Sequence, residues 1–285
     1  MEKTIQIQSG KYIFQIEENT QMRDEDILYT AIKIGGNYLD CVSIFINYNN
    51  NKPLNANMPH AMYDEKCAIT HLDKGDGSRI MIKTILEYIK QNYPTIKEIK
   101  YDDMSSIECA TDEELSQATN RKRGTHLKPM SLYNLSIAYN GQTWYEKYFG
   151  AKKVKKHEKY RERVTTLLQT KPPHFNDFLK ITRAPEKLWD ELFKFYEGAK
   201  TYSDFFHSIP KPERCQLLRP WIDEFMKHYL DDVFSNSGWI IPMSINGGGK
   251  PRRQTRKRMP TFYVPDGVRL TTNYQMNLGI SVNEV

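Results

Sequence analysis

Residues 73–78 form a polar, Gly-containing loop, DKGDGS, that could bind a phosphate group. An apolar run at 66–72 precedes this loop, and an amphipathic helix that ends before Pro94 follows it. A helix that begins after such a loop presents free backbone N–H groups at its N-terminus, and these attract anions. Gly75 and Gly77 would also let a ligand approach the backbone closely. The alternative is an ordinary strand-to-helix turn.

Residues 143–153, TWYEKYFGAKK, contain a second candidate for chemistry, the phenol of Tyr145. Tyr145 stands just before a Phe149-Gly150 break and a basic run. A Tyr with an ordinary pKa of about 10 is well matched to the protonation of a thiolate leaving group. The alternative is that Tyr145 and its neighbour Trp144 are amphipathic core aromatics.

In this order the two segments resemble the GCN5-related N-acetyltransferase (GNAT) family, over residues 26–154. In that family a pyrophosphate-binding loop follows the central strand, and a later Tyr-bearing helix faces the thioester sulfur. The resemblance implies acyl transfer from acetyl-CoA to an amine acceptor that the sequence does not identify. It also implies an α+β fold with a mixed, mainly antiparallel sheet and flanking helices.

The resemblance assigns roles to particular residues. Tyr145 would protonate the CoA thiolate, and a backbone N–H near residues 69–71 would polarise the thioester carbonyl. The base that deprotonates the amine would come from a set of polar residues near the loop: Asp102, Asp103, Glu108 and His71. The residues expected at the CoA pyrophosphate are Leu72, Lys74, Gly75, Asp76, Gly77 and Ser78.

A non-catalytic protein with a GNAT-like fold is the alternative function. Leu72 stands where the family commonly has Gln or Arg, and the Phe149-Gly150 pair reverses the family's order. A long polar insertion at 102–129, with one short helix expected at 112–117, separates the two motifs. The Trp-Tyr-Glu-Lys segment is reminiscent of proteins from large DNA viruses, in which such a fold could serve as a structural, virion or assembly component.

A basic, Gly-rich segment near the C-terminus accounts for the formal net charge of +6. Six charges fall within nine residues: Lys250, Arg252, Arg253, Arg256, Lys257 and Arg258. Such a cluster could neutralise nucleic-acid phosphates or contact a protein partner. A solvated linker or a localisation signal is the alternative interpretation.

Several short elements must position these residues. Alternating runs at 4–8 and 11–17 predict a hairpin, and an Asn- and Pro-rich stretch at 49–59 predicts an exposed loop. In the helix after the Gly loop, apolar residues recur at helical spacing from Ile82 to Tyr93, which predicts one face packed on a sheet. The strand–helix–strand unit that this helix completes predicts a parallel crossover.

Three ranges are expected for the domains. Residues 1–170 would form the GNAT-like domain, 171–243 a helical module, and 244–285 the basic linker with an extended C-terminal arm. The boundary at 170 rests on Pro172 and Pro173 and on the helical periodicity beyond them.

The composition predicts an intracellular protein with reduced thiols and no membrane span. The four cysteines are widely spaced and include no C-x-x-C pair, so buried free thiols are expected for Cys41, Cys67, Cys109 and Cys215. No stretch approaches the length of apolar sequence that a spanning helix needs. The first ten residues contain no apolar signal region.

Overall fold

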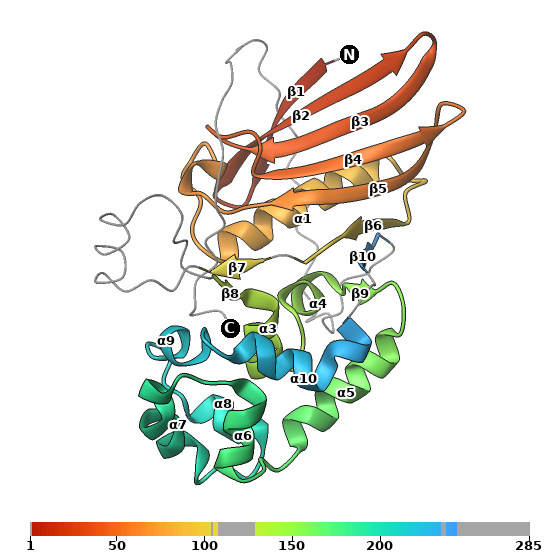
Figure 1. The fold of residues 1–285 in the computed structure, drawn as a ribbon. Helices are drawn as coiled ribbons and strands as arrows, with labels where there is room; N and C mark the ends of the chain where they lie inside the picture. The colour runs from red at the N-terminus through yellow and green to blue at the C-terminus, as the bar shows by residue number, and fades with distance from the viewer. Residues whose placement is uncertain (1, 104, 108–128, 235–237, 244–285) are drawn as a thin grey trace, which may run out of the picture. The chain divides into compact units, whose positions relative to one another are not determined.

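The computed structural model describes residues 2–103, 105–107, 129–234 and 238–243 (Figure 1). Contacts between Cα atoms divide this chain into two compact units. Of the described residues, the first unit holds 2–102, 148–151 and 240–243, and the second holds 103, 105–107, 129–147, 152–234 and 238–239. These units do not follow the ranges expected from the sequence, because the chain passes between them several times.

An α+β architecture with a mixed, mainly antiparallel sheet is confirmed. The eight-stranded sheet has the order β1-β2-β3-β4-β5-β6-β10-β9. Its strands are β1 (Glu2–Ser9), β2 (Tyr12–Arg23), β3 (Asp26–Gly35), β4 (Val42–Asn49), β5 (Lys52–Ala61), β6 (Glu98–Tyr101), β9 (Lys152–Lys153) and β10 (Trp239–Pro242). A separate ribbon pairs β7 (Ser106–Ile107) with β8 (Met130–Ser131).

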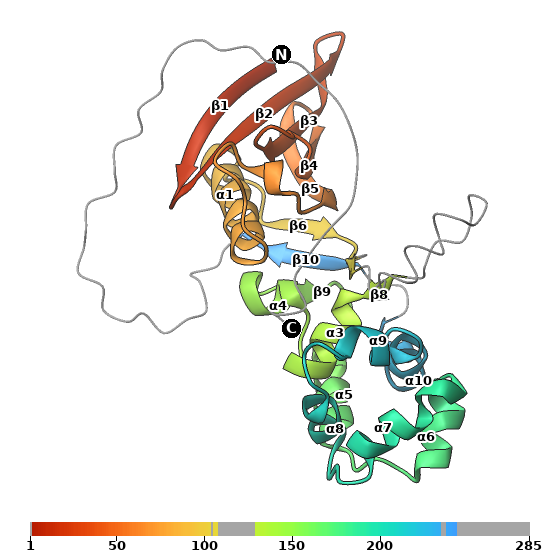
Figure 2. The same ribbon diagram turned by 90° about the vertical axis from the view of Figure 1, so that its left-hand side faces the viewer.

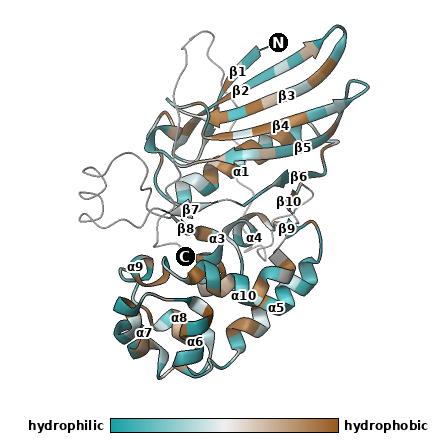
Figure 3. Ribbon diagram, in the orientation of Figure 1, coloured by the Kyte–Doolittle hydropathy of each residue, from teal (hydrophilic) through white to brown (hydrophobic). Residues whose placement is uncertain are grey.

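The first unit places one long helix, α1 (Asp76–Asn92), on one face of its strands (Figure 2). Even-numbered residues of β2, β3 and β4 point to this face, since Phe14, Ile32 and Ile44 are fully buried. The Tyr88 hydroxyl of α1 donates a 2.5 Å hydrogen bond to Glu18 of β2, which fixes the same orientation. Figure 3 shows hydrophobic and hydrophilic segments alternating along these strands, as a one-sided core requires.

The predicted parallel crossover is confirmed, but its first strand is β5. Ala56 and Asn57 pair in parallel with Ile99 and Lys100 of β6, and α1 connects the two strands. The exposed loop predicted at 49–59 is therefore largely wrong. Asn and Pro made this segment look like a loop, whereas its pairing with β4 and β6 and the burial of Ala56 and Met58 make it a strand.

The strand predicted at 66–72 is also wrong. This segment forms a 3-10 turn, η1 (Glu65–Cys67), followed by irregular chain in which His71 adopts a left-handed conformation with φ 68°. The Asp64 side chain accepts a hydrogen bond from the Lys66 backbone N–H at 2.8 Å and caps this turn. A local cap thus overrides the apolar pattern.

The second unit is mostly helical, and its helices from Phe175 onward lie in the range 171–243 for which helices were predicted. Its helices are α3 (Leu132–Asn140), α4 (Trp144–Phe149, of which the last two residues belong to the first unit), α5 (His157–Gln169), α6 (Phe175–Thr182), η2 (Glu186–Leu188), α7 (Trp189–Tyr196), α8 (Tyr202–Ser208), α9 (Arg214–Leu218) and α10 (Ile222–Phe234). None of the helices in the described ranges is long and apolar enough to cross a membrane.

An aromatic cluster forms the core of the second unit. Trp221 lies at its centre, fully buried, with its ring centroid 5.1 Å from that of Phe178 and 5.9 Å from that of Phe225. Phe205 and Phe206 stack on the same indole ring. Pro220 separates two helices of this unit, since α9 ends before this proline and α10 begins after it.

Candidate functional site

The predicted phosphate loop leads directly into α1. Gly75 is the N-cap residue with φ 75°, a conformation that favours glycine, and no side chain caps the first turn. Backbone N–H groups at this end can therefore donate hydrogen bonds to an outside partner. The predicted order of a Gly-containing loop followed by an amphipathic helix is confirmed.

The space beside Gly77 is filled by the protein itself. A Cβ atom added at Gly77 would lie 2.8 Å from Cγ and 2.9 Å from Cδ1 of Leu72. Leu72 is fully buried, so it cannot swing aside into solvent. Gly77 is therefore required by the packing of Leu72, and this explains its presence without any ligand.

The aspartates of the loop are already paired. The Tyr12 hydroxyl donates a 2.8 Å hydrogen bond to Oδ2 of Asp73, and Lys11 forms an ion pair with the same carboxylate. These contacts, Lys11 first, hold the pKa of the Asp73 carboxyl below its usual value. Asp76 pairs with Arg79 at 2.8 Å. Lys11 and Arg79 thus offset the two carboxylates, which leaves the exposed Lys74 as the charge that the loop offers to a pyrophosphate.

Further hydrogen bonds attach the chain before the loop to the sheet. Ile69 N–H donates to the Ile13 carbonyl at 2.8 Å, and Ile13 N–H donates to the Thr70 hydroxyl oxygen at 3.1 Å. The Tyr63 hydroxyl donates to the Leu72 carbonyl at 3.0 Å. These bonds fix the position of Leu72 against Gly77. They also use the Ile69 N–H that was a candidate to polarise a thioester carbonyl.

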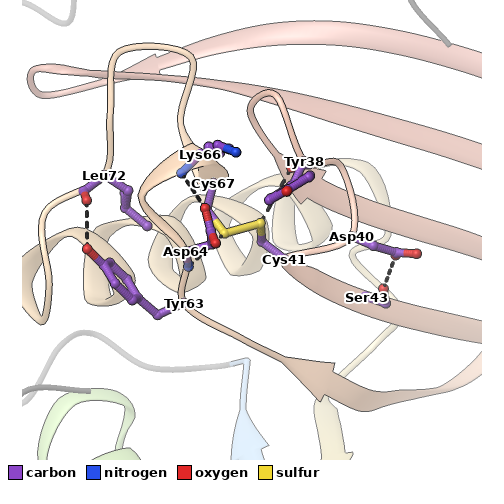
Figure 4. Close-up of a disulfide and its surroundings, with 9 residues drawn as sticks. All are labelled: Tyr38, Asp40, Cys41, Ser43, Tyr63, Asp64, Lys66, Cys67 and Leu72. Atoms are coloured by element: carbon purple, nitrogen blue, oxygen red, sulfur yellow. Dashed lines mark hydrogen bonds between the residues drawn. A yellow bond between two sulfur atoms is a disulfide. The ribbon is translucent and has the colours of Figure 1, made fainter. Parts of the chain in front are cut away.

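A disulfide crosslinks this loop region to the β3–β4 connection (Figure 4). Cys41 and Cys67 are fully buried and bonded to each other, with 5.8 Å between their Cα atoms. Cys215 is disulfide-bonded as well. The prediction of reduced thiols is therefore wrong for these three residues. Widely spaced cysteines gave no sequence signal for this pairing, because the chain's fold brings them together.

The β3–β4 connection and the chain around Cys67 approach each other so closely that a Cβ atom does not fit between their backbones. A Cβ atom on Gly36 would lie 2.2 Å from the backbone carbonyl carbon of Ala68. Tyr38 N–H donates to the Lys66 carbonyl at 3.2 Å across the same gap. Gly36 therefore permits the close contact between the two backbones, and the Cys41–Cys67 disulfide crosslinks the same two segments. The region around the predicted cofactor loop is built as a crosslinked corner of the fold.

The remaining predicted cofactor residues offer few groups for a ligand. Lys74 is exposed, whereas Ser78 is 5% exposed and its Oγ is buried without a hydrogen-bond partner. A molecule outside the fold does not reach this oxygen. The fit to acetyl-CoA is therefore poor, since Leu72 fills the space beside Gly77 and the Ser78 hydroxyl is buried.

The predicted catalytic residues are divided between the two units. His71 is exposed and its ring Nδ1 lies 3.9 Å from Glu65, and Asp102 is exposed just after β6. Both belong to the first unit, whereas Tyr145 belongs to the second. Tyr145 is 8% exposed, and burial, reinforced by nearby Asp103, raises the pKa of its phenol far above the usual value. This environment opposes proton donation to a thiolate.

The TWYE segment has a structural role that the sequence analysis missed. The Thr143 hydroxyl oxygen accepts a 3.2 Å hydrogen bond from the Glu146 N–H, and Oε2 of Glu146 accepts a 2.7 Å bond from the Thr143 N–H. This is a reciprocal capping box at the start of α4, and its Thr-x-x-Glu spacing is readable from sequence. Glu146 also accepts a 2.7 Å hydrogen bond from the Tyr160 hydroxyl. The motif can therefore be explained by helix capping.

Asp103 is a buried acid whose ionisation should oppose folding. Ser105 donates to Oδ1 through its hydroxyl at 2.6 Å, while Oδ2 is buried without a partner. Burial raises the carboxyl pKa above its ordinary value of 3.8, so the stability contributed by this group is present below that value and is lost as the pH rises through the folded-state pKa.

We expect Asp103→Asn to remove this pH dependence. Relative to the variant, the wild-type protein should lose free energy of unfolding as the pH rises from about 4 to about 7. Urea unfolding across this range measures the difference, and other titrating groups cancel because both proteins share them. Identical pH profiles for the two proteins would show that the Asp103 carboxyl does not have a raised pKa.

Several of the sequence predictions fall outside the described residues. They include the helix expected at 112–117, the candidate base Glu108 and the free thiol expected for Cys109. They also include the extended arm at 244–285 and its basic cluster with the expected partner contacts: Lys250, Arg252, Arg253, Arg256, Lys257 and Arg258.

Comparisons with known proteins do not extend this description. The chain matches no family model, and neither the curated proteins nor the solved structures contain a match. Within the described residues, no group of three or more His, Cys, Asp and Glu side chains is arranged to hold a metal ion.

Proposed function

We propose that this protein is a non-catalytic structural protein with a GNAT-like first unit, and that it works through contacts with other proteins in an assembly. The observation that carries this proposal is the side chain of Leu72 beside Gly77, where a cofactor would need room. Internal packing against Leu72 is sufficient to explain the glycine at position 77, so no ligand is needed to account for this residue.

The arrangement of the acid and base candidates supports the same proposal. Acetyl transfer requires a proton acceptor near the amine and a proton donor near the thiolate. His71 and Asp102 are exposed and make no contact with each other that would mark a prepared base, and the phenol of Tyr145 is buried. A structural protein needs none of these groups to be aligned.

The disulfides extend the proposal to the protein's surroundings. Disulfides persist where thiols are oxidised and are rare in the reducing cytosol. The expected intracellular location rested partly on reduced thiols, and the Cys41–Cys67 bond removes that support. We propose a mature protein in an oxidising environment, of which the surface of a virus particle is one example.

One observation favours the second candidate, an acetyl-CoA-dependent N-acetyltransferase. The parallel pair β5 and β6 joined by α1, together with the uncapped first turn at Gly75, is the arrangement that the GNAT resemblance implies. In that case the first-turn amides and Lys74 would hold the pyrophosphate. The two candidates differ in one measurable property, the affinity for acetyl-CoA.

Calorimetric titration of the folded full chain with acetyl-CoA tests the proposal. The expected result is no saturable binding at ligand concentrations up to about 1 mM, weaker than the micromolar affinity of a working cofactor site. Lys74→Glu reverses an exposed charge at the loop, and Lys90→Glu makes the same change near the other end of α1. Micromolar binding that is weakened by Lys74→Glu but not by Lys90→Glu would overturn the proposal and establish the second candidate.

A further inference from the structure

The sheet of the first unit has a second face that α1 does not cover. Even-numbered residues of β2 to β4 point toward α1, so the odd-numbered residues of these strands point the other way. Figure 1 looks onto this face, with α1 behind the strands. Most odd-numbered side chains here are half-buried, and α1 lies on the opposite side of the strands from them.

Two cross-strand rows on this face combine amides with aromatic rings. One row pairs Gln21, Tyr29, Asn47 and Asn55 across β2 to β5. The adjacent row pairs Asn19, Ala31, Phe45 and Asn57. The Tyr29 and Phe45 rings touch diagonally, with 5.8 Å between their centroids. We call the two rings and the five surrounding amides the amide–aromatic patch.

The amides of the patch are held in place and still have groups to offer. Asn47 donates through Nδ2 to Oδ1 of Asn55 at 2.8 Å, and Gln21 donates through Nε2 to Oδ1 of Asn19 at 2.9 Å. Each of these bonds uses one of the amide's two polar groups, and the other can donate to or accept from a ligand. The patch is therefore a preorganised surface of alternating donors and acceptors around two rings.

The patch carries no formal charge. In the next row, Glu17 stands opposite Lys33, which also forms a 3.0 Å ion pair with Asp40. On β6, the exposed Lys100 pairs with Asn57 of the patch, and Glu98 lies two residues before it on the same face. A nucleic-acid surface needs an excess of cations to neutralise phosphates, whereas here the acidic Glu17, Asp40 and Glu98 balance the basic side chains of Lys33 and Lys100. A neutral ligand with many hydroxyl groups matches the charge and hydrogen-bonding capacity of the patch.

We propose that the amide–aromatic patch binds a neutral oligosaccharide. The apolar C–H face of a sugar ring would lie on Phe45 and Tyr29, which bury apolar area while presenting a flat surface. Sugar hydroxyls both donate and accept hydrogen bonds, as do the surrounding amides. This inference does not depend on whether the protein is catalytic, because the patch and the Gly75 loop lie on different elements.

The probes are three uncharged hexasaccharides: β-linked glucose, α-linked glucose and β-linked N-acetylglucosamine. Calorimetry with the full chain should show binding of at least one, with a Kd between about 10 μM and about 10 mM. Phe45→Ala should weaken that binding at least about tenfold. Asn57→Asp keeps the side-chain shape but replaces the amide donor, and it should also weaken binding without a risk to the core.

A matched control removes an exposed ring elsewhere. Phe193→Ala in α7 deletes a phenyl group that is 40% exposed in the other unit, and it should leave oligosaccharide affinity unchanged. Absence of binding by all three hexasaccharides would contradict the proposal. Binding that survives both Phe45→Ala and Asn57→Asp would contradict it too, as would an oligothymidylate that displaces the sugar from the patch.

Discussion

Trp221→Ala should lower the free energy of unfolding by about 3–5 kcal/mol. Trp221 is fully buried and contacts Phe178, Phe205, Phe206 and Phe225, so truncation removes most of the shared packing surface of the second unit's core. The cavity that remains adds to the lost transfer free energy. Urea unfolding followed by far-UV circular dichroism measures the change.

Two control variants test whether the loss of stability in Trp221→Ala comes from the packing of the aromatic cluster. Trp221→Phe keeps an aromatic ring and removes an indole N–H that is buried without a partner, so it should cost clearly less than Trp221→Ala. Trp189→Ala removes an indole that is 38% exposed and donates a 2.9 Å hydrogen bond to the Ala184 carbonyl, and it should cost clearly less than Trp221→Ala. Similar costs for Trp221→Ala and Trp189→Ala would show that the aromatic cluster does not stabilise the unit.

Removal of the Cys41–Cys67 disulfide should lower the free energy of unfolding by about 3.5 kcal/mol. The bond closes a loop with a sequence separation of 26, and the estimate follows from the chain entropy that such a loop loses in the unfolded state. The double variant Cys41→Ala, Cys67→Ala is the appropriate test, because reducing agents would also break the bond of Cys215.

The control for this prediction is the same double variant in the presence of reductant. Reduction should further destabilise the double variant only through the bond at Cys215, whereas it should destabilise the wild type through both bonds. A double variant within about 0.5 kcal/mol of the oxidised wild type would contradict the role assigned to the crosslink.

Regular elements with long periodic patterns were predictable from the sequence. The helix α1 shows its apolar stripe openly, and the β1–β2 hairpin has Gly10 at its turn with φ 61°. Both depend on local patterns that the fold has no reason to override.

The errors have physical causes in tertiary contacts. β5 is rich in Asn and Pro, yet it becomes a strand because β4 and β6 pair with it on both sides. The segment 66–72 is apolar for another reason. Leu72 and Cys67 lie in a turn and irregular chain, yet both side chains are buried. Leu72 packs against Gly77 and Cys67 is bonded to Cys41, so the apolar residues of this segment do not indicate a strand.

The candidate site was only partly predictable. A glycine-capped helix start can be recognised from sequence, but the occupant of the space beside Gly77 cannot. The Thr143-x-x-Glu146 spacing was readable as a capping box, and the acetyltransferase resemblance drew attention to Tyr145 instead. The rows of the amide–aromatic patch depend on strand register, which the sequence does not specify.

The most direct test of the structural role of the loop is a double-mutant cycle between Gly77 and Leu72. In the wild-type background, Gly77→Ala should destabilise by about 1–3 kcal/mol, because the new Cβ collides with the Leu72 side chain. In the Leu72→Ala background the collision is gone. Alanine should then stabilise the first turn of α1 by up to about 1 kcal/mol through its helix propensity.

This reversal of sign is the result that we predict from chemical unfolding of the four proteins. A cost of Gly77→Ala that is the same in both backgrounds would contradict the account, because the glycine would then serve something other than the packing of Leu72.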